Sequence, residues 1–207
     1  MHSPNLIQTI VNAKPTPYLF GAIGWMLMWQ LQILLQTQIT SLDYATGVAL
    51  IFLPAGIRTL SVLVFGLRGA IGVFIGCIAS TIEYMGDLPA LEIWHVLTIC
   101  GISAFSAYVM MQVICWWRKI GADLDELQFS DVLFIVFTQG LLSASLHQLL
   151  FARLGLEGAY SNPSTWDSFM LWAAMATGDI VGSMVLMLGG IAVANLFATL
   201  LSTSRQS

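Results

Sequence analysis

The sequence is poor in charge. Only 9% of its 207 residues are Asp, Glu, Lys or Arg, whereas 57% are hydrophobic. A soluble globular domain carries about 25% charged residues. So few charges cannot cover a surface that faces water, so a lipid bilayer must supply most of the solvent. The composition predicts an integral membrane protein and excludes a soluble enzyme.

Basic residues and cysteines are scarce as well. Seven Lys and Arg residues and a formal net charge of −4 leave no basic face for a phosphate backbone, which excludes a nucleic-acid partner. The three cysteines, Cys77, Cys100 and Cys115, lie in apolar stretches without a CxxC neighbour. They indicate neither a disulfide scaffold nor a zinc site, and we expect them to act as small apolar side chains. We expect no cofactor and no bound metal.

Catalytic signatures are also lacking, since the sequence has no phosphate-binding loop and no zinc-protease motif. Ser143 lies one helical turn before His147, but no third partner is placed by the sequence. We therefore expect that the protein is not an enzyme.

Long apolar runs are what the chain has in abundance. A helix needs about 20 mostly apolar residues to cross about 30 Å of hydrocarbon. The runs predict an all-α fold, a polytopic transmembrane helix bundle of about six spans. The expected spans are Tyr18–Gln36, Tyr44–Phe65, Gly69–Met85, Leu91–Trp117, Asp131–Phe151 and Asp167–Ala192. Because the last run continues to Leu201, we expect it to tilt, to kink at Gly189–Gly190 or to end in an interfacial tail.

The distribution of Lys and Arg predicts the orientation. With the N-terminus in the cytoplasm, the inner side collects five of these residues, whereas the outer loops hold only Arg153. Positive residues concentrate on the cytoplasmic side, so both termini are expected there. We expect one transmembrane domain, residues 18–201, between a cytoplasmic segment 1–17 and a cytoplasmic tail 202–207. The inner residues are Lys14, Arg68, Arg118, Lys119 and Arg205.

The second expected span contains a break. Pro54 has no N–H to donate, and Gly56, which follows two residues later, lacks a Cβ. The helix is expected to kink or open there. Free backbone carbonyls at membrane depth are tolerated only where protein or a water-filled cavity covers them. We therefore expect the break to face the interior of the bundle.

Ionisable side chains in hydrocarbon are costly, so each one is a functional candidate. At about 1.5 Å per residue, Arg58 lies about 21 Å and Asp179 about 18 Å below the outer ends of their spans, which allows an ion pair. The pair could simply hold two helices together, or it could form a ligand or proton site at the broken helix. A GxxxG face beside Asp179 would allow close helix packing. The predicted ligand-binding or coupling residues are Pro54, Gly56, Arg58, Gly178, Asp179 and Gly182.

Two other polar groups have simpler interpretations. Glu83, His95 and His147 are expected near the outer surface as an interface cluster, since their spacing matches no metal motif. The charged stretch Arg118–Asp131 is expected to be a solvated turn in which Ser130 caps the next helix. A cytoplasmic partner could also dock there.

Two motifs resemble a known family. Residues 51–58 read IFLPAGIR and residues 63–66 read LVFG, which is similar to the proline–glycine motif of the MASE-type membrane-associated sensor domains of the first-described class. Those domains also carry a Gly-Asp-x-x-Gly pattern in a late helix, and residues 178–182 here read GDIVG. The family motif commonly has a tryptophan and often a second proline, where this chain has Phe52 and Leu53.

The resemblance implies a sensor-like protein of a bacterial inner membrane. A small ligand would act at the helix broken by Pro54, and a separate cytoplasmic or membrane signalling partner would receive the signal, since we expect no output domain in these 207 residues. Two alternatives stay open: a substrate-binding component of a small-solute transporter, and a structural membrane protein.

Overall fold

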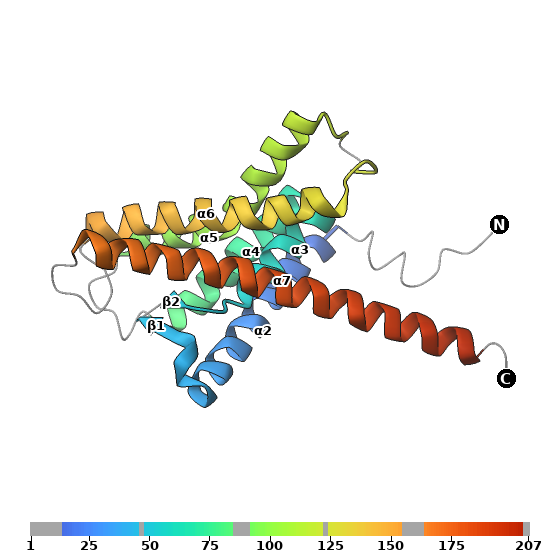
Figure 1. Ribbon diagram of the computed structural model, residues 1–207, viewed down its shortest axis with the longest axis horizontal. Helices are drawn as coiled ribbons and strands as arrows, with labels where there is room; N and C mark the ends of the chain where they lie inside the picture. Colours follow the sequence, from blue (N-terminus) through green and yellow to red (C-terminus); the bar gives the residue numbers. More distant parts are fainter. Residues whose placement is uncertain (1–13, 46–47, 85–91, 122–123, 155–163, 205–207) are drawn as a thin grey trace.

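The computed structural model describes residues 14–45, 48–84, 92–121, 124–154 and 164–204, with the backbone alone for 83–84 and 193–204. The regular secondary structure in these ranges is helical apart from one small ribbon of two strands (Figure 1). The elements are, in chain order, helix α2 (Thr16–Gln38), a 3₁₀ turn (Thr40–Leu42), strands β1 (Asp43–Ala45) and β2 (Val48–Ala49), and helices α3 (Pro54–Phe65), α4 (Leu67–Tyr84), α5 (Ile93–Arg118), α6 (Phe129–Leu154) and α7 (Thr165–Ser204).

Four helices in the described ranges are long and apolar enough to cross a membrane: α2, α5, α6 and the part of α7 from Thr165 to Ala192. The all-helical membrane-type fold expected from composition is thus confirmed. Helices α3 and α4 are shorter. The 12 residues of α3 extend for about 18 Å at about 1.5 Å per residue, little more than half of the hydrocarbon thickness. Large apolar side chains are exposed on the outer faces of the helices, among them Leu27, Val64, Ile75, Leu149 and Val185.

The prediction that Tyr44–Phe65 is a helical span with a break at Pro54 is wrong for the part before Pro54. Strands β1 and β2 pair antiparallel, and the chain then runs without a helix up to Pro54, the first residue of α3. Proline is well suited to the first turn of a helix, because its missing N–H would have no partner there and its φ is already helical. Pro54 therefore starts a half-length helix instead of kinking a long one.

Helix α3 is short but lies at the centre of the bundle. It packs against α2, α4, α5 and α7, and residues 54–59 are all buried. The expectation that the break faces the interior is confirmed. Gly66, with φ of +58°, then reverses the chain into α4, a conformation that glycine adopts without steric cost.

Helices α2 and α4 approach each other closely through glycines. A Cβ at Gly72 would collide with the carbonyl of Tyr18, and a Cβ at Gly76 would collide with the carbonyl of Ala22. Small residues allow such backbone contact between helices in membranes.

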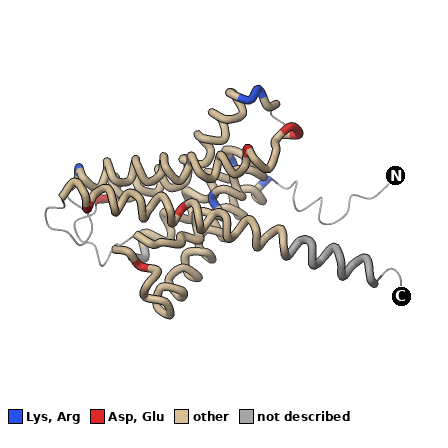
Figure 2. The backbone as a smooth tube through the Cα atoms, viewed as in Figure 1, with Lys and Arg blue, Asp and Glu red and all other residues tan. Residues whose placement is uncertain are grey.

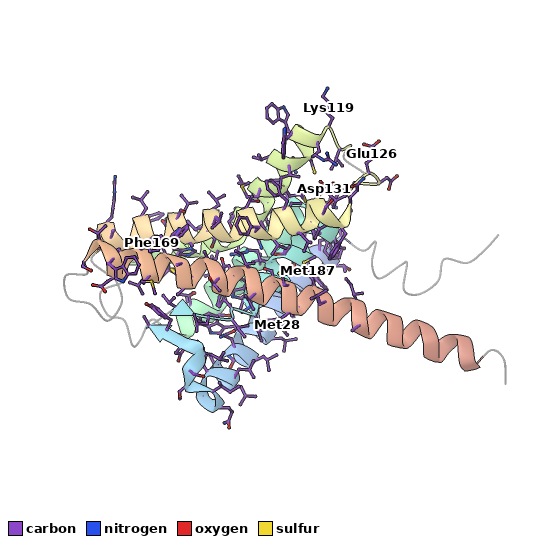
Figure 3. All side chains as sticks on the ribbon, viewed as in Figure 1. Met28, Lys119, Glu126, Asp131, Phe169 and Met187 are labelled. Carbon is purple, nitrogen blue, oxygen red and sulfur yellow. The ribbon has the colours of Figure 1, made fainter. Side chains whose placement is uncertain are left out.

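Charged residues gather at the two ends of the bundle, and the middle of the described chain carries few (Figure 2). Lys119 and Glu126 lie at the end with the α5–α6 connection, whereas Phe169 lies at the opposite end (Figure 3). Helix α7 is 40 residues long and uninterrupted through Gly189 and Gly190. At about 60 Å it is longer than the hydrocarbon core is thick, and it extends beyond the other helices (Figure 1).

The connection between α5 and α6 is closed by an ion pair. Arg118 Nε lies 3.2 Å from Asp131 Oδ1, and the other oxygen of Asp131 accepts the backbone N–H of Gln128 at 3.1 Å. The expectation that Ser130 caps this helix is wrong, since α6 begins one residue earlier, at Phe129. The cap is the carboxylate of Asp131, which also suits the positive end of the helix dipole.

Candidate functional site

A cavity of about 780 Å³ lies at the end of the bundle away from the α5–α6 connection. Its outer part is lined by exposed residues such as Asp43 and Tyr44, and its inner part by buried ones such as Arg58 and His147. Every helix from α2 to α7, together with the strand ribbon, contributes to the wall. The lining residues are Trp25, Trp29, Gln32, Ile33, Gln36, Asp43, Tyr44, Ala45, Val48, Ala49, Phe52, Arg58, Cys77, Thr81, Ile99, Ser103, Ser143, His147, Phe151, Met175 and Asp179.

The innermost wall of the cavity holds the ion pair that matching depths predicted. Arg58 Nη2 lies 2.9 Å from Asp179 Oδ2. Arg58 Nη1 donates to the carbonyl oxygen of Ser103 at 3.1 Å and to Ser143 Oγ at 3.3 Å. The exposed fraction of the side chain is 1% for Arg58 and 11% for Asp179, so the carboxylate is the partner with access to the cavity.

Glycines bring α7 close enough for this pair to form. A Cβ at Gly178 would collide with the carbonyl of Ala49, and a Cβ at Gly182 would collide with the carbonyl of Phe52. The N–H of Phe52 donates to the carbonyl oxygen of Gly178 at 3.0 Å. A Cβ at Gly56 would in turn collide with α7. The close approach expected of the GxxxG face is present, and its neighbour is the segment that leads into α3 and the first turn of that helix.

A glutamine from α2 supports the start of α3. Gln32 Oε1 accepts the backbone N–H of Leu53 at 3.0 Å, one residue before Pro54. Gln32 is itself buried. The side chain satisfies a donor at the helix N-terminus that water would satisfy in a soluble protein.

His147 is part of the same network. Its Nδ1 lies 2.9 Å from the carbonyl oxygen of Ser143, and its Nε2 lies 3.3 Å from Ser103 Oγ. A carbonyl oxygen only accepts, so Nδ1 carries a hydrogen. The imidazole therefore touches both residues that hold Arg58, although it makes no direct bond to the ion pair.

The expected outer cluster of Glu83, His95 and His147 is not what the structure shows. His147 is buried in the cavity wall, whereas His95 Nδ1 accepts a backbone N–H at the start of α5. The side chain of Glu83 lies outside the described residues. Within the described part of the chain, no three His, Cys, Asp or Glu residues lie close enough to hold a metal ion.

A second polar layer lies one helical turn beyond the ion pair. Gln139 Nε2 donates to Thr59 Oγ1 at 2.6 Å and to Ser183 Oγ at 3.2 Å, which joins α6 to α3 and α7. Sequence reasoning missed this layer. A signal for it was present, because Gln139, Ser143 and His147 follow each other at intervals of four and so lie on one face of α6.

The six predicted site residues fall into one contiguous region. Arg58 and Asp179 make the ion pair, while the glycines and Pro54 shape the backbone that brings α3 and α7 together. Comparisons with protein-family models, with curated proteins and with solved structures found no match to this chain. Its function is therefore argued from the site itself.

Proposed function

We propose that the protein is a membrane-embedded sensor that binds a small ligand in the cavity at the start of α3. The observation that carries this proposal is the position of the Arg58–Asp179 pair, which is buried and yet forms the inner wall of a cavity of about 780 Å³. A cavity of this size suits a metabolite-sized molecule. The four apolar helices support a membrane location, and a bacterial inner membrane is part of the proposal.

The energetics of a buried ion pair favour a role beyond holding the bundle together. The cost of removing both charges from water offsets much of their attraction, so apolar side chains of similar size stabilise a fold as well or better. Such a pair is better suited to favouring one arrangement of the helices over another than to raising the free energy of unfolding. A ligand that binds one arrangement of the pair more tightly would shift the population of that arrangement.

The signal would leave the site through α3 and α7. Both helices carry a member of the pair and contact each other through Gly56 and Gly182. In the proposed orientation both termini are cytoplasmic, and the partner is a separate signalling protein that contacts the α5–α6 connection or the end of α7. The motifs at residues 51–58 and 178–182, which resemble those of the MASE-type sensor domains, lie at this same contact.

Ligand binding is tested by a thermal-stability screen of the purified chain in phospholipid nanodiscs against a library of metabolite-sized compounds. At least one compound is expected to stabilise the wild type and to have no effect on Ile99→Trp, which fills the cavity. Ile75→Trp, on an exposed face of α4, is the matched control and should respond like the wild type. If no compound distinguishes the two variants, the cavity is not a ligand site.

Coupling is tested with hydrogen–deuterium exchange of the compound-bound protein. The compound is expected to change exchange in α3 and around residues 178–182, and the change should vanish in the Arg58→Met/Asp179→Leu double variant. Binding without any change in α3 would contradict a sensor and leave a passive binding site.

A transporter component is the second candidate. A half-length helix that begins inside the bundle next to a cavity is also the arrangement of substrate sites in many transporters, and α3 has this form. Uptake of a stabilising compound into cells or proteoliposomes that depends on this chain would favour transport. A stable bundle that binds no ligand and that tolerates substitution of Arg58 and Asp179 would instead indicate a structural protein.

A further inference from the structure

The charges that line the cavity do not balance. Within the described chain, the ionised lining side chains are Asp43, Arg58 and Asp179. Arg58 and Asp179 neutralise each other at 2.9 Å, whereas no described Lys or Arg forms an ion pair with Asp43. Asp43 lies at the exposed outer part, where its carboxylate accepts a hydrogen bond from Gln36 Nε2. The cavity therefore carries one uncompensated negative charge at its mouth.

The deeper part also presents a carboxylate and not a guanidinium. Asp179 keeps 11% of its side chain exposed, whereas Arg58 keeps 1%. The Nη atoms of Arg58 are already engaged by Asp179, Ser103 and Ser143. The N–H on Nε has no hydrogen-bond partner in the described part of the chain but is buried, so an anionic ligand would find no exposed guanidinium edge in this arrangement. The uncompensated charge of Asp43 repels an anion and attracts a cation at the mouth, and the carboxylate of Asp179 gives the deeper part a hydrogen-bond acceptor.

Aromatic side chains line the same cavity. The rings of Trp25 and Trp29 each pack edge-to-face against Phe52, with centroid distances of 6.0 Å and 6.1 Å. Tyr44 and Phe151 also line the cavity. Indole and phenol faces carry negative electrostatic potential and attract organic cations, while the same rings bury apolar groups. The wall suits a molecule that combines an ammonium group with an apolar body.

We infer that the cavity binds a small organic amine in its protonated form. Its ammonium group lies beside Asp43 and Tyr44 at the mouth, and its apolar body lies against Trp29, Phe52 and Trp25. This inference rests on the proposed function, since it names the class of ligand that the sensor site takes. The amine reaches the inner wall from the side of Asp179, so it can bias the ion pair without displacing Arg58.

Three compounds of one skeleton and different charge test this inference: 2-phenylethylamine, 2-phenylethanol and 3-phenylpropanoate. Affinity for the wild-type chain in uncharged detergent is measured by isothermal titration calorimetry. The amine is expected to bind at least tenfold more tightly than the alcohol, and the carboxylate more weakly than both. A carboxylate that binds best would overturn the inference, and so would an alcohol that binds as tightly as the amine.

Two variants test which carboxylate attracts the ammonium group of the ligand. Asp43→Asn, nearly isosteric, is expected to weaken the amine about fivefold and to leave the alcohol unchanged, because an exposed ion pair contributes modestly. Asp167→Asn removes a charge at the same end of the bundle that does not line the cavity, and it should change neither. Equal loss in both variants would mean that the general surface charge attracts the amine, which contradicts a site at Asp43.

The outcomes separate this inference from the proposed function. If none of the three compounds binds at millimolar concentration, the amine class is wrong. The ligand site itself still stands if a library compound distinguishes Ile99→Trp from Ile75→Trp. If no compound of any kind makes that distinction, the proposed function fails, and the inference fails with it.

Discussion

The described part of the chain contains two Arg–Asp ion pairs of almost the same length in contrasting surroundings. Arg58 and Asp179 meet at 2.9 Å in the middle of the bundle, with exposed fractions of 1% and 11%. Arg118 and Asp131 meet at 3.2 Å at the end of the bundle, with exposed fractions of 48% and 10%. The first pair joins α3 to α7 beside a cavity, whereas the second closes the connection between consecutive helices.

The comparison shows that surroundings, and not the distance between the charges, decide what an ion pair does. A pair near water gains little, because solvent screens the attraction and the side chains lose freedom. In a buried pair each charge depends on the other, because neither has water as an alternative partner. Replacing Arg118 at the end of the bundle is expected to have little effect, because its guanidinium is half exposed. The central pair can be changed only as a unit.

The largest effect on stability is expected when one residue of the Arg58–Asp179 pair is replaced. Arg58→Met should lower the free energy of unfolding by about 3–5 kcal/mol, because Asp179 would be left in the bundle without its guanidinium. The measurement is unfolding in mixed micelles titrated with SDS. A loss below about 1 kcal/mol would mean that water reaches Asp179 freely.

The second-largest effect is expected for Gly178→Ala, which should lower the free energy of unfolding by about 1–3 kcal/mol. The added Cβ would collide with the carbonyl of Ala49 and push α7 away from α3. Gly101→Ala is the control, because nothing lies within 4 Å of a Cβ there. That control should be neutral or stabilising by up to about 1 kcal/mol, as alanine is the better helix former. The same SDS titration measures both variants, and equal effects would show that the contact of α7 is not tight.

Gln32→Met tests the support of the half-length helix. The substitution leaves the N–H of Leu53 without its acceptor, which should cost about 1–3 kcal/mol. Gln30→Met, on an exposed face of the same helix, should be close to neutral. Thermal unfolding of the two variants side by side gives the difference, and matching midpoints would rule out a role of Gln32 at the start of α3.

The smallest effect is expected at the end of the bundle. Arg118→Met should cost less than about 1 kcal/mol, because the guanidinium is half exposed. That small cost should disappear in about 1 M salt, where charges are screened beyond about 3 Å, whereas the cost of Arg58→Met should persist. Unfolding titrations at low and high salt measure this, and a salt-independent loss for Arg118 would contradict the comparison.

Much of the site could be predicted from the sequence, because strong physical constraints act on single residues. A charge within an apolar run must find a partner, and that rule brought Arg58 and Asp179 together across 121 positions. Proline without an N–H had to interrupt the second apolar run, and glycines four apart had to mark a close contact. Each of these inferences depends on chemistry that is local in the sequence.

The rest depends on the relative placement of several elements. The chain before Pro54 is apolar enough to be helical, but it forms two strands and a non-helical stretch in which the N–H of Phe52 donates to Gly178 of α7. The cavity is bounded by every helix, so no single stretch reveals it. The polar face of α6 could be predicted from the spacing of its residues. Its partners could not, because the contact of His147 with Ser103 depends on where α5 lies.

One measurement tests most directly whether the central pair is there for coupling and not for stability. It is the free energy of unfolding of Arg58→Met, Asp179→Leu and the double variant, taken as a double-mutant cycle. The account predicts that each single variant loses about 3–5 kcal/mol and that the apolar double variant stays within about 1.5 kcal/mol of the wild type. A double variant that loses the sum of the two single losses would contradict it.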